Sequence, residues 1–158
     1  MSCRRRVGRR AAAPPGRSLW VVLDPGVLIS ALLSPCSAPA RLYLLWLGGE
    51  FELVVCPHLI EELEGVLRRP KFYDLVTPDE VGEFVEIIRR GAISVENPVI
   101  AEGVTRDPGD DYLVALAQAA NVDYLVSGDK DLTSLTTVSP PVLSPAAFLD
   151  LLGPLPRA

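Results

Sequence analysis

Short, continuous runs of apolar residues alternate along the chain with segments of helical periodicity. Three runs rich in β-branched residues, at residues 20–24, 52–56 and 122–126, predict buried strands. A strand that is covered on both faces has no polar side, so its sequence reads as an unbroken apolar run. Weaker runs at residues 92–95 and 138–143 predict two further strands.

Five other segments carry apolar residues at helical spacing and predict helices over residues 38–47, 58–68, 78–90, 110–120 and 145–152. Thr77, Pro78 and Glu80 have the arrangement of a capping box with proline at the first helical position, and Ser144-Pro145 begins a helix in a similar way. Alternating buried strands and helices predict an α/β fold, a three-layer α/β/α sandwich with a central parallel sheet and right-handed crossovers.

The composition sets limits on domain organisation. The chain has 158 residues, of which 49% are hydrophobic, and this is enough for one sizeable core. Residues 1–18 contain six arginines and no acid, which predicts a disordered basic tail; no apolar stretch follows the arginines as a signal peptide requires. We therefore expect one domain over residues 19–152 and a short tail over residues 153–158.

The overall charge gives nucleic acid no general attraction. The formal net charge is -5, so a nucleic-acid partner must be held by local basic residues. Candidates are Arg41, Arg68, Arg69, Lys71, Arg89 and Arg90. The pairs at 68–69 and 89–90 equally suit the C-terminal ends of helices, where cations are stabilised by the helix dipole.

Cysteine usage and hydropathy exclude several classes of protein. Three cysteines without a CxxC pair and a single histidine make neither a disulfide framework nor a zinc site, which favours a reducing, cytoplasmic setting. No apolar stretch approaches the ~20 residues needed to span a bilayer, so no membrane partner is expected.

Aspartates follow two of the predicted strands. Asp24 closes the first strand, and Asp129 comes shortly after the strand at 122–126. Ligand sites in parallel sheets lie beyond the carboxyl ends of the strands, so both residues are candidates for a site. Each is equally an ordinary residue for a helix cap or a turn.

Helical wheels select acids on two of the predicted helices. Glu62 lies about 40° from Val66 at the edge of the packed stripe and is predicted to face inward, whereas Glu61 points to solvent. Glu64 lies at the other edge, and the wheel does not exclude it. In the later helix, Asp110 falls on the buried side and Asp111 falls about 100° further round, toward solvent.

Gathering Asp24, Glu62, Asp110 and Asp129 at one sheet edge would cost much Coulombic energy unless protons or a divalent cation neutralised them. Oxygen ligands without His or Cys suit Mg²⁺ or Mn²⁺. Such a cation can bridge a phosphate oxygen and lower the pKa of an attacking water. The predicted chemistry is phosphodiester hydrolysis.

Four stretches together resemble the PIN domain family, and more closely its branch of toxin components from bacterial and archaeal toxin-antitoxin pairs. They are residues 21–34 (VVLDPGVLISALLS), 53–63 (LVVCPHLIEEL), 106–111 (RDPGDD) and 124–132 (YLVSGDKDL). The likeness extends from about residue 20 to residue 152.

The resemblance implies a Rossmann-like domain that acts as a Mg²⁺- or Mn²⁺-dependent endoribonuclease on single-stranded RNA. It also implies a homodimer or higher homo-oligomer that is silenced by an antitoxin protein. The family's catalytic acids map onto Asp24, Glu62, Asp110 or Asp111, and Asp129, and the metal ligands onto Asp24, Asp110, Asp111 and Asp129. Ser127 takes the place of the family's small hydroxyl residue, and Asp131 is a candidate acid outside the ligands.

The chain departs from the family at one place. The family usually has Asp-Thr-Asn after the first strand, and this chain has Asp24-Pro25-Gly26. A hydroxyl, an amide side chain and a backbone donor are therefore missing. This leaves a second hypothesis, a catalytically weak or silent PIN-fold protein that acts by binding protein or RNA. A phosphatase with Asp24 as nucleophile is disfavoured, because Gly26 stands where a second aspartate would be required.

Overall fold

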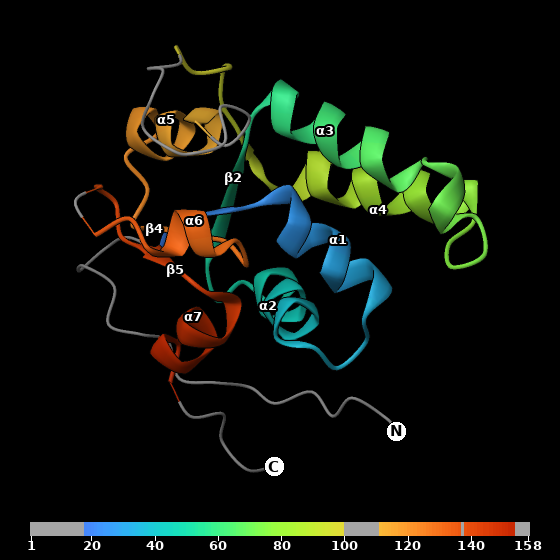
Figure 1. Cartoon of the computed structure of the whole chain (residues 1–158), viewed down its shortest axis with the longest axis horizontal. Helices are drawn as coiled ribbons and strands as arrows, with labels where there is room; N and C mark the ends of the chain where they lie inside the picture. The colour runs from blue at the N-terminus through green and yellow to red at the C-terminus, as the bar shows by residue number, and fades with distance from the viewer. Residues whose placement is uncertain (1–17, 100–110, 137, 154–158) are drawn as a thin grey trace.

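The computed structural model describes residues 18–99, 111–136 and 138–153. Thirteen elements follow one another in that part of the chain (Figure 1). They are β1 (Trp20–Leu23), α1 (Pro25–Leu33), α2 (Ala38–Leu47), β2 (Glu52–Val55), α3 (Pro57–Leu67), the 3-10 helix η1 (Pro70–Phe72), α4 (Pro78–Gly91), β3 (Ile93–Ser94), α5 (Asp111–Ala119), β4 (Tyr124–Val126), α6 (Lys130–Thr133), β5 (Val142–Leu143) and α7 (Pro145–Leu151). The predicted tails lie outside the described residues except for Ser18 and Gly153.

The strands form one sheet in the order β3-β2-β1-β4-β5, and every pairing is parallel. The predicted parallel α/β fold is therefore confirmed. The chain moves outward from β1 through β2 to β3 and then returns to the other side of β1 as β4. Because crossovers are right-handed, such a reversal places helices on both faces of the sheet. Figure 1 shows α5 on one side of β4 and β5, with α2 and α7 on the other.

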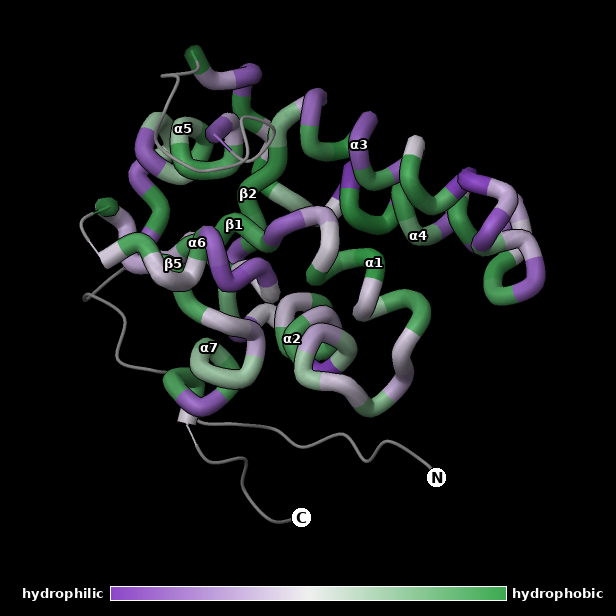
Figure 2. Tube along the Cα trace, in the orientation of Figure 1, coloured by the Kyte–Doolittle hydropathy of each residue, from purple (hydrophilic) through white to green (hydrophobic). Residues whose placement is uncertain are grey.

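The central strands are apolar because both of their faces are covered. After their first residues, β1, β2 and β4 consist of side chains that are at most 1% exposed. In Figure 2, β1 and β2 are correspondingly hydrophobic, while the connection from α3 to α4 carries much hydrophilic chain. β3 and β5 have two residues each, shorter than the predicted runs at 92–95 and 138–143, and they are the edge strands of the sheet.

Proline and a preceding cap residue start most of the helices. Proline occupies the first turn of α1, α2, α3, α4 and α7, where its missing N–H leaves no hydrogen bond unmade. The capping box predicted at α4 is confirmed, because Thr77 Oγ1 accepts from the Glu80 amide at 3.1 Å and Glu80 Oε1 accepts from the Thr77 amide at 3.2 Å. The Ser144 cap of α7 is confirmed as well.

Helix α1 was not predicted from the sequence. Asp24, Pro25 and Gly26 have the composition of a turn, yet Asp24 is the N-cap of α1 and Pro25 its first residue. The short helix α6 was also unexpected, and Asp129 caps it in the same way. Both unpredicted helices therefore begin at the aspartates that follow β1 and β4.

Within the described ranges no single helix is long and apolar enough to cross a bilayer; α1 and α2 satisfy that test only as a pair bent by 96°. Cys56 is free and buried.

Candidate acidic site between β1 and β4

Asp24 is held at the end of β1 by its backbone and by both of its carboxylate oxygens. Its amide donates to the Val126 carbonyl of β4 at 2.9 Å. Oδ1 accepts from the Gly26 amide at 2.8 Å, which caps α1, and Oδ2 accepts from the Ser127 hydroxyl at 2.7 Å. The carboxylate is therefore oriented by α1 on one side and by the end of β4 on the other.

Ser127 connects Asp24 to Asp129. Its side chain is fully buried, and its Oγ accepts from the Asp129 amide at 3.0 Å while donating to Asp24. Asp129 Oδ1 accepts from the Asp131 amide at 2.8 Å and so caps α6. One buried hydroxyl thus fixes the geometry of two aspartates that are far apart in the sequence.

Asp24 and Asp129 line the same cavity, of about 370 Å³. The other lining residues are small or apolar, with one hydroxyl: Gly26, Val27, Ser30, Pro39, Gly128 and Pro145. The two acids converge because β1 and β4 are neighbours, with Leu23 in register with Val126, at the point where the strand order reverses. Such reversals leave a crevice at the carboxyl edge of a sheet.

Glu62 reaches toward the start of α5. The residue is exposed, although the prediction placed it facing inward. Its carboxylate nevertheless makes one contact with the interior, because Oε2 accepts a hydrogen bond from the hydroxyl of the buried Tyr112. Glu61 is exposed, as predicted. Glu64 forms an ion pair with Arg68 at 3.1 Å.

Tyr112 was not selected from the sequence, although it directly follows the two acids at a helix start. It is 3% exposed, and its ring packs edge-on against His58 with centroids 4.3 Å apart. Burial, and after it the hydrogen bond and charge of Glu62 and the charge of Asp24, raise the pKa of Tyr112 far above its usual value. Its hydroxyl is therefore a donor at physiological pH.

The structure corrects the prediction for Asp111. The helical wheel directs this residue to solvent, but Asp111 is only 2% exposed. The next three residues are buried as well, so the first turn of α5 has no solvent face and a wheel for an amphipathic helix does not apply. Asp110 lies outside the described residues.

The described part of the acidic cavity offers two carboxylates, those of Asp24 and Asp129, to a metal ion. Among the described residues no group of three or more His, Cys, Asp or Glu side chains could hold a metal ion. Asp24, Glu62 and Asp129 therefore do not form such a group by themselves, and the fourth predicted acid, Asp110, lies outside the described residues. Mg²⁺ commonly binds through one or two carboxylates and keeps several waters, so Asp24 and Asp129 fit a hydrated cation of this kind.

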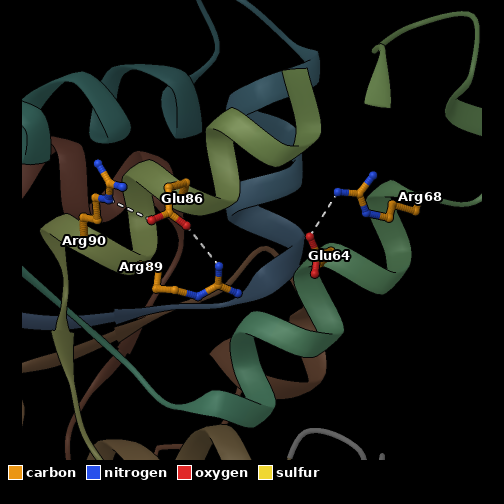
Figure 3. Close-up of polar contacts among 5 residues, drawn as sticks. All are labelled: Glu64, Arg68, Glu86, Arg89 and Arg90. Carbon is orange, nitrogen blue, oxygen red and sulfur yellow. Dashed lines mark hydrogen bonds and ion pairs between the residues drawn. The ribbon is translucent and has the colours of Figure 1, made fainter. Parts of the chain in front are cut away.

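Three of the predicted basic candidates pair with acids of their own helices (Figure 3). Arg68 lies 3.1 Å from Glu64, and Arg89 and Arg90 lie 3.1 Å and 2.7 Å from Glu86. The hydrogen bonds from Arg90 and Arg89 lower the pKa of the Glu86 carboxyl. These pairs fit the helix-end interpretation of Arg89 and Arg90, which occupy the last turn of α4.

A second cavity, of about 460 Å³, lies at the ends of β2 and β3. Its polar side chains include Glu61, Arg89 and Glu96, which are exposed, and its floor includes Val55 and Cys56. Burial raises the pKa of the Cys56 thiol. None of the described residues that line this cavity is an aspartate.

Comparison with known proteins gives a family and a fold. The profile of the family described as PIN domain matches residues 20–131. A comparison with curated proteins gives no match. Among solved structures, PAE2754 from Pyrobaculum aerophilum is 14% identical with a TM-score of 0.57, covering 85% of this chain and 89% of its own. VapBC2 from Rickettsia felis, solved bound to a DNA fragment from their promoter, is 12% identical with a TM-score of 0.52, covering 79% of this chain and 97% of its own.

Proposed function

The chain belongs to the PIN domain family, and from this premise we propose that it is a metal-dependent endoribonuclease acting on single-stranded RNA. The observation that carries the proposal is the pair of aspartates, Asp24 and Asp129, which one buried serine holds on the wall of one cavity. Acids in fixed geometry at the carboxyl edge of a parallel sheet are well placed to act on a ligand in that crevice.

Asp24 and Asp129 would hold Mg²⁺ or Mn²⁺, with Asp110 as a further ligand and Glu62 as a neighbouring acid; Asp111 does not form a group of three with the two aspartates of the cavity. A bound cation of this kind supplies charge stabilisation at a phosphate oxygen and lowers the pKa of a water. Ser127 keeps Asp24 oriented, and Asp131 keeps Asp129 oriented through its amide. No side chain of the site is required as a covalent nucleophile.

RNA must approach this acidic cavity past local positive charge. Arg41 is exposed on α2, two residues after Pro39 of the cavity wall, and Lys130 is exposed directly after Asp129. Both are better placed than Arg68, Arg89 and Arg90, whose guanidinium groups already pair with acids. We propose that Arg41 and Lys130 contact the phosphates on either side of the cleaved bond.

We also propose that the chain is a cytoplasmic toxin that forms a homodimer or higher homo-oligomer and whose activity is blocked by an antitoxin protein. The support is the family and the similarity of fold to VapBC2. Co-expression with the product of a neighbouring small gene, followed by size-exclusion chromatography and a ribonuclease assay, tests this. Failure of that product to bind or inhibit would contradict it.

The ribonuclease proposal is tested with Asp24→Asn. We expect single-stranded RNA to be cleaved in Mn²⁺ and not in EDTA, and the substitution to lower kcat by about 100-fold or more, since it removes a carboxylate charge from the site. Asp74→Asn is the matched control, because Asp74 is exposed in the connection before α4. Cleavage that persists in EDTA and is unaffected by Asp24→Asn would overturn the proposal.

A second candidate function is binding without catalysis. It is favoured by Gly26, which supplies no side chain beside Asp24, and by the absence of a three-acid group among the described residues. The two candidates differ in thermal melting with and without Mn²⁺. A nuclease with an occupied site should gain stability with rising Mn²⁺ concentration, whereas a silent protein should not.

A further inference from the structure

Tyr112 joins α5 to α3 beside the acidic site, and no step described above makes use of it. Its side chain is buried, its hydroxyl donates to Glu62 Oε2, and its ring lies against His58 at an interplanar angle of 79°. His58 and Glu62 are one helical turn apart on α3, so they lie on the same face of that helix. One face of α3 therefore contacts both the ring and the hydroxyl of Tyr112.

We propose that Tyr112 is a positioning residue that holds the Glu62 carboxylate at the edge of the site formed by Asp24 and Asp129. This inference rests on the proposed ribonuclease function, because it gives Glu62 a fixed place in that reaction. Tyr112 itself contacts neither substrate nor metal in this scheme.

Glu62 and Tyr112 differ in the conformational freedom of their side chains. Glu62 is an exposed residue, and a long exposed side chain samples many rotamers that ordering must restrict. Tyr112 is the opposite case, since a buried ring has little freedom and directs its hydroxyl from a fixed point. A hydrogen bond to an ionised carboxylate is shorter and about twice as strong as a neutral one, so it can select one rotamer of Glu62.

The helix that carries Glu62 begins at the sheet edge that also bears the acidic cavity. Glu62 lies on the helix that follows β2, and Asp24 directly follows β1; because β1 and β2 are parallel neighbours, both acids follow strands that end at the same edge of the sheet. The charges of both acids also act on the Tyr112 hydroxyl. The Tyr112 ring also anchors the first turn of α5, which carries Asp111. Tyr112 thus holds one acid through its hydroxyl and packs at the start of the helix that bears another.

Substitution of Tyr112 by phenylalanine removes the hydroxyl and keeps the ring. We expect Tyr112→Phe to lower kcat for RNA cleavage about tenfold and to change KM by less than about twofold. In a Glu62→Gln background, the same substitution should change kcat by less than about twofold, because its effect passes through Glu62. Tyr124→Phe is the control, since the Tyr124 ring packs on Phe148 and its hydroxyl has no bond to a described carboxylate.

A loss of activity that is equal in the wild-type and Glu62→Gln backgrounds would overturn the inference, as would an unchanged kcat in Tyr112→Phe. The second readout does not need activity. The ¹³C resonance of the Glu62 carboxyl should shift in Tyr112→Phe and remain in place in Tyr124→Phe. If the wild-type protein cleaves no RNA, the proposed function fails, and an unshifted Glu62 resonance then separately overturns the positioning by Tyr112.

Discussion

The two cavities lie along the same edge of the sheet, yet they differ in how firmly the charged side chains on their walls are held. The larger one has three exposed charged residues, Glu61, Arg89 and Glu96, on an apolar floor. The smaller one has Asp24 and Asp129, whose oxygens and amides are fixed by Ser127 and by two helix starts. Size therefore does not identify the site. The acids of the smaller cavity are already held by hydrogen bonds, so little free energy is needed to order them when a ligand binds.

Among the variants that test this difference between the cavities, Ser127→Ala is expected to have the largest effect. The change removes the buried hydroxyl that Asp24 Oδ2 and the Asp129 amide share as a hydrogen-bond partner. We expect a loss of about 1–3 kcal/mol in the free energy of unfolding. Activity should fall by about 10- to 100-fold, as it does when a group that orients a metal ligand is removed.

Chemical denaturation and RNA cleavage measure these two effects. Ser134→Ala is the matched control, because Ser134 is exposed and its hydroxyl bonds to the Asp131 carbonyl at 3.3 Å. If Ser127→Ala kept full activity, the ordered geometry of the smaller cavity would not matter for function.

A smaller effect is expected from Gly26→Asn, which adds an ordering group to the same cavity. A Cβ at Gly26 would meet Asp24 Oδ1 at 3.5 Å, which is ordinary van der Waals contact, so the side chain fits. The new amide can donate a hydrogen bond within the cavity, and we expect kcat to rise by about three- to tenfold. Gly65→Asn, on the exposed side of α3, is a control with nothing within 4 Å of its added Cβ. An unchanged or lower kcat would show that Gly26 does not limit the reaction.

The smallest effect should come from the larger cavity. Glu61→Gln is expected to change kcat by less than about twofold, because an exposed group in water contributes little. Its neighbour on α3 offers a paired comparison, since Glu62→Gln removes the negative charge of the group that accepts from the Tyr112 hydroxyl and should lower kcat. Equal losses in the two variants would mean that both cavities take part in the reaction.

The sequence predicted best those features that are set by burial along a strand. The apolar runs that end at Asp24 and precede Asp129 predicted a parallel sheet, and the sheet's strand order brings the two aspartates together. Helix α1 was missed because Asp24-Pro25-Gly26 has turn composition, although the same residues form a cap and a first turn.

Features that depend on packing between helices could not be predicted in this way. The burial of Asp111 follows from neighbours that enclose the whole first turn of α5, which a helical wheel does not represent. The bond from Tyr112 to Glu62 joins residues of α5 and α3 that no local pattern relates. Such contacts come only from the tertiary structure.

The two aspartates of the smaller cavity are also the caps of α1 and α6. Asparagine caps a helix about as well as aspartate does, so an Asp-to-Asn exchange at either position can end the chemistry while the fold persists. A single inherited change of this kind would convert an enzyme into a well-folded protein without catalytic activity, which natural selection can still retain for binding through its surface. A lineage built on this arrangement can therefore lose catalysis in one step without passing through an unfolded ancestor.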